Sequence, residues 1–173
     1  MDGDNMEYSF KTKEYYKCDE FKHIDLDSLY NGDPNSYELL DYDLNAIIYV
    51  EAPITLNILK ERMREVFDVK KISSKALEII LKETEKLGFI TTDNLFDVTY
   101  WTPEGVFKQS FIRTGYQRQI YDIPLEEISL ISRELKLRGI KGEAHHRAIL
   151  DFFGYEVLTE KANTYLDFVM RRG

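Results

Sequence analysis

Apolar residues recur at helical spacing along two long regions of the chain. In the first region the spacing predicts a helix over 37–50, a second helix capped by Thr55, and a third that begins at Ser73. Serine and threonine oxygens accept hydrogen bonds from the first turn of a helix, and glycine readily adopts the left-handed conformation that ends one. Because Gly88 stands where the third helix should end, we expect three consecutive helices here.

Two short segments with strand-like composition follow the third helix. They are Phe89–Ile90 and Leu95–Trp101, and the polar residues 92–94 between them predict a turn. Three helices followed by a β-hairpin is the order of a winged-helix domain. We therefore predict such a domain over residues 37–103.

The second apolar region predicts three further helices over residues 123–173. Gly139–Gly142 separates the first helix from the second, Gly154 ends the second, and Thr159 caps the last. A connecting loop is expected over residues 104–122. The predicted fold is therefore mainly α with a small β-hairpin, a winged helix followed by a three-helix unit.

The segment before these domains, residues 1–36, is acidic and rich in tyrosine, and it contains a cluster of turn formers at Asn31–Ser36. Its apolar residues are too frequent for a disordered tail. We expect part of this lead-in to pack on the rest of the chain or on a neighbouring domain.

Composition limits the possible classes of protein. A length of 173 residues with 43% hydrophobic content suits one or two small domains with packed cores. Cys18 is the sole cysteine, which excludes an internal disulfide and favours a reducing, cytoplasmic environment. The chain has no apolar run of about 18 residues and no signal-peptide pattern at its start. Membrane and secretory functions are therefore not expected.

The formal net charge of −8 is unevenly distributed. The first fifty residues hold 12 acids and 4 bases, whereas residues 51–100 hold 9 and 8, and residues 101–173 hold 10 and 11. Since the acidity is confined to the first fifty residues, the rest of the chain can still present a local basic surface.

The helix that begins at Ser73 would be the recognition helix of a domain that docks on DNA. The basic residues around it are Lys70, Lys71, Lys75, Lys82 and Lys86. The last four recur at spacings of 4, 7 and 4, which places them along one stripe able to contact phosphates. The alternative is an ordinary solvated face, because three glutamates are interleaved with the lysines. The helix contains no Arg, Asn or Gln, so base-specific recognition is not expected.

The predicted hairpin holds Asp93 and Asp97 and no base. Wings that enter a minor groove present Arg or Lys, so this hairpin favours a structural or protein-facing role.

The second half of the chain combines basic and aromatic residues. Its candidate nucleic-acid contacts are Arg113, Arg118, Arg138, Lys141 and Arg147, and the interleaved rings are Phe107, Phe111, Tyr116 and Tyr121. Such a mixture can form a groove in which bases of a single strand stack on aromatic rings. Alternatively, the rings pack the loop on the core and the arginines pair with the acidic first fifty residues.

The adjacent pair His145–His146 does not predict a metal site. Neighbouring side chains on a helix diverge by about 100°, and no third ligand is evident. The chain also lacks a nucleophile–histidine arrangement and a phosphate-binding Gly-rich loop. We therefore expect no catalytic residue, metal or cofactor.

Three paired segments carry a resemblance to a known family. They are Val50–Ile54 with Leu59–Arg62, Trp101–Pro103 with Arg113, and Ile123–Glu127 with Phe153–Tyr155. In this order, over about residues 44–170, they resemble the winged-helix-like domain of unknown function at the C-terminal end of large bacterial superfamily 1 DNA helicases. The resemblance implies an accessory, DNA-engaging domain whose ATPase motifs lie upstream, and it carries no catalytic residue over to this chain.

These observations favour a binding module over an enzyme. The leading hypothesis is an accessory module of a helicase-type DNA-processing protein, with DNA or the upstream helicase domains as its partners. Binding to DNA would be weak and independent of sequence. The alternative is a protein-interaction module that docks a partner or the upstream domains through the acidic first fifty residues and the acidic hairpin. A winged-helix transcriptional regulator is a third hypothesis.

Overall fold

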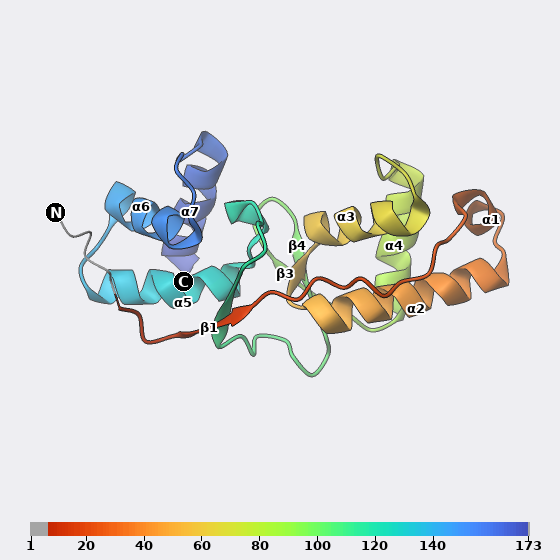
Figure 1. Cartoon of the computed structure of the whole chain (residues 1–173), viewed down its shortest axis with the longest axis horizontal. Helices are drawn as coiled ribbons and strands as arrows, with labels where there is room; N and C mark the ends of the chain where they lie inside the picture. The colour runs from red at the N-terminus through yellow and green to blue at the C-terminus, as the bar shows by residue number, and fades with distance from the viewer. Residues whose placement is uncertain (1–6, 173) are drawn as a thin grey trace. The chain divides into compact units, whose positions relative to one another are not determined.

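The computed structural model describes residues 7–172, which form two compact units. The central unit contains residues 16–107. The terminal unit contains residues 108–172 together with the described part of residues 1–15. The lead-in predicted over residues 1–36 is therefore divided between the two units. Most of the ordered structure is helical, as the sequence predicts (Figure 1).

Helices dominate the central unit because its apolar positions recur on one face of each segment. Its helices are α1 (Leu26–Tyr30), α2 (Pro34–Glu51), α3 (Leu56–Phe67) and α4 (Ser74–Lys86). The Ser73 side chain accepts a hydrogen bond from the N–H of Ala76, so the predicted cap of the third helix is confirmed. Thr55 precedes α3, but its side chain makes no capping hydrogen bond.

A small antiparallel sheet completes the central unit. Its strands, in the spatial order β2-β4-β3, are β2 (Ile54–Thr55), β4 (Val98–Trp101) and β3 (Ile90–Asp93). The turn lies later than predicted, because Asp93 still pairs with Val98 and residues 94–97 make the turn. Asp97 also accepts a hydrogen bond from the N–H of Asn57 at 2.8 Å. The hairpin thus caps α3 in place of Thr55.

The core of the central unit lies between α2, α3 and α4 and includes fully buried Leu40, Leu44, Ile47, Ile48, Leu59, Met63, Val66, Ala76 and Ile80. A buried ion pair closes one end of this core. Arg62 Nη2 lies 2.7 Å from Glu51 Oε1, and Arg62 Nε lies 2.8 Å from Glu51 Oε2. This two-point contact ties the end of α2 to α3.

The terminal unit pairs a strand near the start of the described chain with a strand 100 residues later. Strand β1 (Lys11–Glu14) runs parallel to β5 (Phe111–Thr114), and α5 (Leu125–Leu137), α6 (Gly142–Phe153) and α7 (Glu160–Arg172) supply most of its core. The predicted loop over 104–122 therefore contains β5 and a short 3₁₀ helix at Ile120–Asp122. Pairing with a distant strand, β1, is a contact that local periodicity does not reveal.

The helices of the two units repeat at a constant spacing. Adding 86 to the residue numbers of α3 and α4 gives the bounds of α6 and α7, and the same step takes the last residue of α2 to that of α5. In the central unit α4 lies across the direction of α2, and in the terminal unit α7 lies across the direction of α5 (Figure 1). Each unit therefore contains one copy of a three-helix repeat.

The turns of this repeat also agree residue by residue. Asp68 and Gly154, which end α3 and α6, both adopt the left-handed conformation. Thr159 accepts a hydrogen bond from the N–H of Ala162, just as Ser73 does from Ala76. The same capping chemistry thus sets the same turn in both copies.

Candidate functional site

A basic notch lies at the turn between α3 and α4 of the central unit. It has a volume of about 230 Å³, and its lining residues are Asn57, Lys60, Glu61, Arg64, Lys70, Lys71 and Ile72. Four bases and one acid give these residues a net charge of +3. Arg64 donates a hydrogen bond to the backbone carbonyl of Lys70 at 3.2 Å, which links the two sides of the notch.

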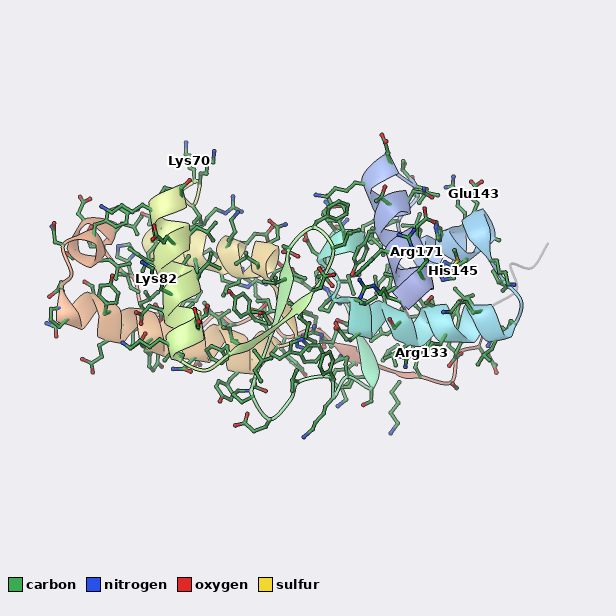
Figure 2. All side chains as sticks on the ribbon, turned by 180° about the vertical axis from the view of Figure 1, so that it is seen from behind. Lys70, Lys82, Arg133, Glu143, His145 and Arg171 are labelled. Carbon is green, nitrogen blue, oxygen red and sulfur yellow. The ribbon has the colours of Figure 1, made fainter. Side chains whose placement is uncertain are left out.

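The helix dipole adds to the positive potential of the notch. Lys70 and Lys71 immediately precede the start of α4, where free backbone N–H groups carry a partial positive charge. Figure 2 shows Lys70 at one end of α4 and Lys82 farther along the helix. A nearby acid, Glu65, is paired with Lys17 at 2.9 Å and does not cancel this potential.

The rest of the predicted lysine stripe is partly neutralised. Lys82 pairs with Glu78 at 3.1 Å, and Lys86 lies 3.8 Å from Glu83. The ammonium group of Lys75 lies 4.3 Å from the centre of the Tyr30 ring. The structure therefore concentrates the positive charge at the start of α4 rather than along its length.

Comparison of the two repeat copies shows that the fold does not require these bases. At the spacing of 86 residues, Lys60, Arg64, Lys70 and Lys71 correspond to His146, Leu150, Glu156 and Val157. The second copy keeps the caps and the left-handed turn without the basic cluster. The four bases of the notch are therefore free to serve a role other than holding the fold.

Arg113 and Arg118 are buried, so the structure does not support their predicted role in phosphate contact. Both guanidinium groups bind the carboxylate of Glu127, with Arg113 Nη2 at 3.0 Å and Arg118 Nη1 at 2.9 Å from Oε2. Burial alone raises the pKa of Glu127, but the two arginines outweigh it and lower that pKa to about 2. This ion-pair cluster anchors β5 and the following loop to α5.

The three remaining predicted bases lie in the terminal unit and do not form one cluster with the notch. Arg138 contacts Glu134 and the carbonyl oxygen of Glu7, and Lys141 is exposed at the start of α6. Arg147 pairs with Glu143 at 3.3 Å on the same helix. The partners of these arginines reduce the charge they present to a phosphate.

The four aromatic residues predicted to line a single-strand groove are dispersed. Phe107 belongs to the central unit and lies near Trp101, whereas Tyr116 stacks on Tyr15 in the terminal unit. Phe111 lies beneath the ammonium group of Lys13, and Tyr121 lies beneath that of Lys161. Among the described residues, neither unit by itself therefore contains a groove lined by all four rings.

The two histidines of α6 come together, contrary to the expected divergence. Their Nδ1 atoms lie 2.8 Å apart, Ser132 Oγ lies 2.8 Å from His145 Nε2, and His146 Nε2 lies 2.7 Å from Asp167 Oδ1. Ser132 and Asp167 each hold one ring, and this draws the rings toward each other. No group of three metal-ligating side chains is found in residues 7–172.

For neutral rings, one set of proton positions satisfies all three contacts of this chain of four residues. Asp167 accepts from His146 Nε2, so His146 Nδ1 is left to accept from His145 Nδ1 when both rings are neutral. His145 Nε2 then accepts from the Ser132 hydroxyl. Burial, with His146 and Lys136 nearby, lowers the pKa of His145 to about 4. The network therefore joins α5, α6 and α7 through a neutral His145.

The sequence did not predict two bases of the notch, Lys60 and Arg64. They lie on α3 and reach the notch only because the turn folds α3 against the start of α4. Their spacing of four residues on one helix was the available signal.

No protein-family model, curated protein or solved structure matches the chain. The resemblance to helicase accessory domains therefore stays a prediction. Across residues 7–172, none of the helices combines the length and the apolar character needed to cross a membrane.

Proposed function

We propose that the central unit is a winged-helix domain that binds nucleic-acid phosphates through the basic notch. The notch carries this proposal, because four bases gather at the start of α4 and the second copy of the repeat lacks them. The element order from α2 to β4 and the sheet order β2-β4-β3 support the winged-helix assignment. In helix-turn-helix domains the start of the recognition helix is the part that approaches DNA.

The contact proposed here is independent of sequence. Lysine and arginine neutralise phosphates and orient a domain on a duplex, but they read no base sequence from that position. α4 carries no Arg, Asn or Gln, and the hairpin presents Asp93 and Asp97. The chain is then a non-catalytic accessory module, and its place in a helicase-type protein rests on the resemblance alone.

Charge reversal in the notch tests this function. Lys71→Glu should weaken binding to a DNA duplex at about 50 mM salt by about tenfold, because it removes one phosphate contact and adds repulsion. Lys82→Glu is the matched control, since it makes the same change in net charge farther along α4. Its effect should stay below about twofold, because Lys82 already pairs with Glu78. Fluorescence anisotropy of a labelled duplex measures both affinities.

Equal losses in the two variants would show that net charge rather than the notch governs binding. Unchanged binding in Lys71→Glu would show that the phosphate contact lies elsewhere on the chain.

A second candidate function is docking of a protein partner by the hairpin tip. Leu95 and Phe96 are 38% and 45% exposed there, beside the carboxylate of Asp93. Exposed apolar side chains with acidic neighbours favour a protein surface over a phosphate backbone. Loss of an interaction in Phe96→Ser, with DNA binding unchanged, would support this function.

A further inference from the structure

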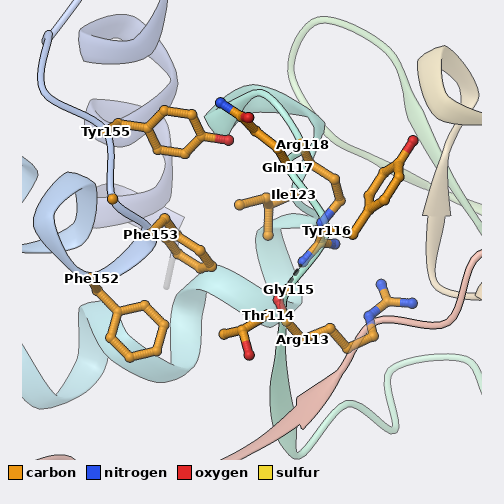
Figure 3. Close-up of a pocket in the computed structure, with 11 residues that line it drawn as sticks. Arg113, Thr114, Gly115, Tyr116, Gln117, Arg118, Ile123, Phe152, Phe153 and Tyr155 are labelled. Atoms are coloured by element: carbon orange, nitrogen blue, oxygen red, sulfur yellow. Dashed lines mark hydrogen bonds between the residues drawn. The ribbon is translucent and has the colours of Figure 1, made fainter.

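A hollow of about 330 Å³ in the terminal unit has the features of a ligand pocket. It lies between the residues that follow β5 and the end of α6, and its lining residues are Arg113–Arg118, Ile123 and Phe152–Tyr155 (Figure 3). Its volume falls at the lower end of the range of roughly 300–1,000 Å³ in which proteins hold small molecules. The pocket lies within one unit and shares no residue with the basic notch.

The aromatic walls of this pocket are held in place from behind. Tyr116 stacks on Tyr15 with their ring centres 4.9 Å apart, and Phe152 packs edge to face against Phe153 at 4.9 Å. Phe152 also contacts the Tyr8 ring at 5.7 Å. A ring fixed in this way, such as that of Phe153, loses little conformational entropy when a planar ring stacks on it.

A buried donor on one of the residues that line the pocket, Arg118, has no hydrogen-bond acceptor among the described residues. Arg118 is only 3% exposed, and its two terminal nitrogens bind Glu127 and the carbonyl oxygen of Arg113. Its third nitrogen, Nε, is buried without a hydrogen-bond partner in the described part of the chain. An unsatisfied buried donor costs free energy, which an acceptor on a bound molecule would recover.

The remaining polar groups can recognise one edge of a planar ring. The Gln117 amide offers both a donor and an acceptor, and the Tyr155 hydroxyl offers the same pair of functions. Figure 3 shows the Tyr155 ring extending toward the Gln117 amide. Arg113 and Arg118 both pair with the carboxylate of Glu127, which offsets part of their positive charge. The pocket therefore suits a neutral ring better than a phosphate.

We propose that this pocket binds an unpaired nucleobase that carries a ring carbonyl, such as thymine. The base would lie against the Phe153 and Tyr155 rings, place a carbonyl oxygen toward Arg118 Nε and present its edge to Gln117. Stacking on aromatic side chains is the usual way in which proteins hold unpaired bases. The pocket holds one base, and this binding does not depend on the notch.

Titration of the full chain with thymidine, followed by ¹⁵N NMR, tests the proposal. Thymidine should shift the Arg118 Nε–H signal and the amide signals of Gly115 and Gly154, with saturation at millimolar concentration. Gln117→Ala should weaken this binding about fivefold, the loss expected for one hydrogen bond. The matched control is Gln119→Ala, another exposed glutamine that does not line the pocket, and it should change the affinity less than twofold.

Two competing probes decide whether the occupant is a base. Inorganic phosphate should leave the pocket signals unchanged. N-acetyltyrosine amide, a mimic of an aromatic side chain of a protein partner, should bind more weakly than thymidine. Stronger binding of the tyrosine mimic, equal shifts with phosphate, or no shift with thymidine up to about 10 mM would each overturn the proposal.

The same titration separates this proposal from the one made for the central unit. A chain that binds duplex DNA through the notch while its pocket signals stay unchanged retains the first function and loses the second. A chain whose pocket signals shift with thymidine but that binds no duplex retains the second function and loses the first.

Discussion

Two buried glutamates show how strongly local surroundings decide the effect of a charge. Glu127 faces two arginines, and these keep it ionised despite its burial. Burial and a hydrogen bond with Asp41 raise the pKa of Glu83 to about 7, although Lys86 opposes this shift. Glu127 therefore stabilises the folded state as a charged group. Glu83, in contrast, destabilises the folded state when it is ionised.

Glu83→Gln should raise stability at neutral pH. The pKa of Glu83 in the folded chain lies above its ordinary value of 4.5, so the folded state binds more protons than the unfolded state between those values. Stability consequently falls as pH rises from about 4.5 to 7, and the variant escapes this loss. We expect a gain of about 2 kcal/mol at pH 8 that vanishes near pH 4, measured by thermal unfolding.

The exposed Glu85→Gln is the control for this prediction, and it should change stability by no more than about 0.5 kcal/mol. A gain that is the same at pH 4 and pH 8 would contradict the assignment of the effect to the Glu83 proton.

At the scale of elements, the two copies of the three-helix repeat differ where α6 carries its histidines. His145 and Ser132 occupy the positions of Leu59 and Ala46 in the first copy. The second copy therefore replaces apolar contacts between its helices with a chain of hydrogen bonds. Such a chain specifies the helix positions as long as each of its members is satisfied.

Ser132→Ala tests the contribution of this chain. The substitution matches Ala46 of the first copy in size, but it leaves His145 Nε2 buried without a donor, which should cost about 1–3 kcal/mol. Thermal unfolding followed by NMR signals of α6 measures this loss. A variant as stable as the parent chain would show that the hydrogen bond from Ser132 contributes nothing.

The pH dependence of the terminal unit follows from His145. Its pKa in the folded chain is lowered to about 4 from an ordinary value of 6.5, so the unfolded state binds more protons between these values. The stability that this residue contributes is therefore present above pH 6.5 and is lost as pH falls toward 4. The NMR shifts of the His145 ring should accordingly stay those of a neutral imidazole at pH 5.

For the whole molecule, the sequence predicts the helices well and the contacts between distant segments poorly. The caps at Ser73 and Thr159 and the left-handed Gly154 are local features that composition reveals. The pairing of β1 with β5 depends on segments about 100 residues apart, and no local pattern specifies it. The repeat was visible in principle, because Ile72-Ser-Ser-Lys-Ala76 and Leu158-Thr-Glu-Lys-Ala162 share their pattern.

The candidate site was predicted only in part for the same reason. Lys70 and Lys71 stand beside a predicted helix start, whereas Lys60 joins them through the fold. Charge alone did not reveal that Arg113 is buried, because its partner Glu127 lies fourteen residues away on another element. Residues in the segments that carry the helicase resemblance form two buried ion pairs, Glu51 with Arg62 and Arg113 with Glu127. Those segments therefore support the fold more directly than DNA contact.

The salt dependence of duplex binding tests the phosphate-binding function of the notch most directly. Each neutralised phosphate releases counterions, so the logarithm of the binding constant should fall linearly with the logarithm of salt concentration. Four bases in the notch predict a slope of about −3.6, which Lys71→Glu should make shallower by about 1. A slope near zero, or no detectable binding at about 50 mM salt, would contradict the proposal that the central unit binds phosphates.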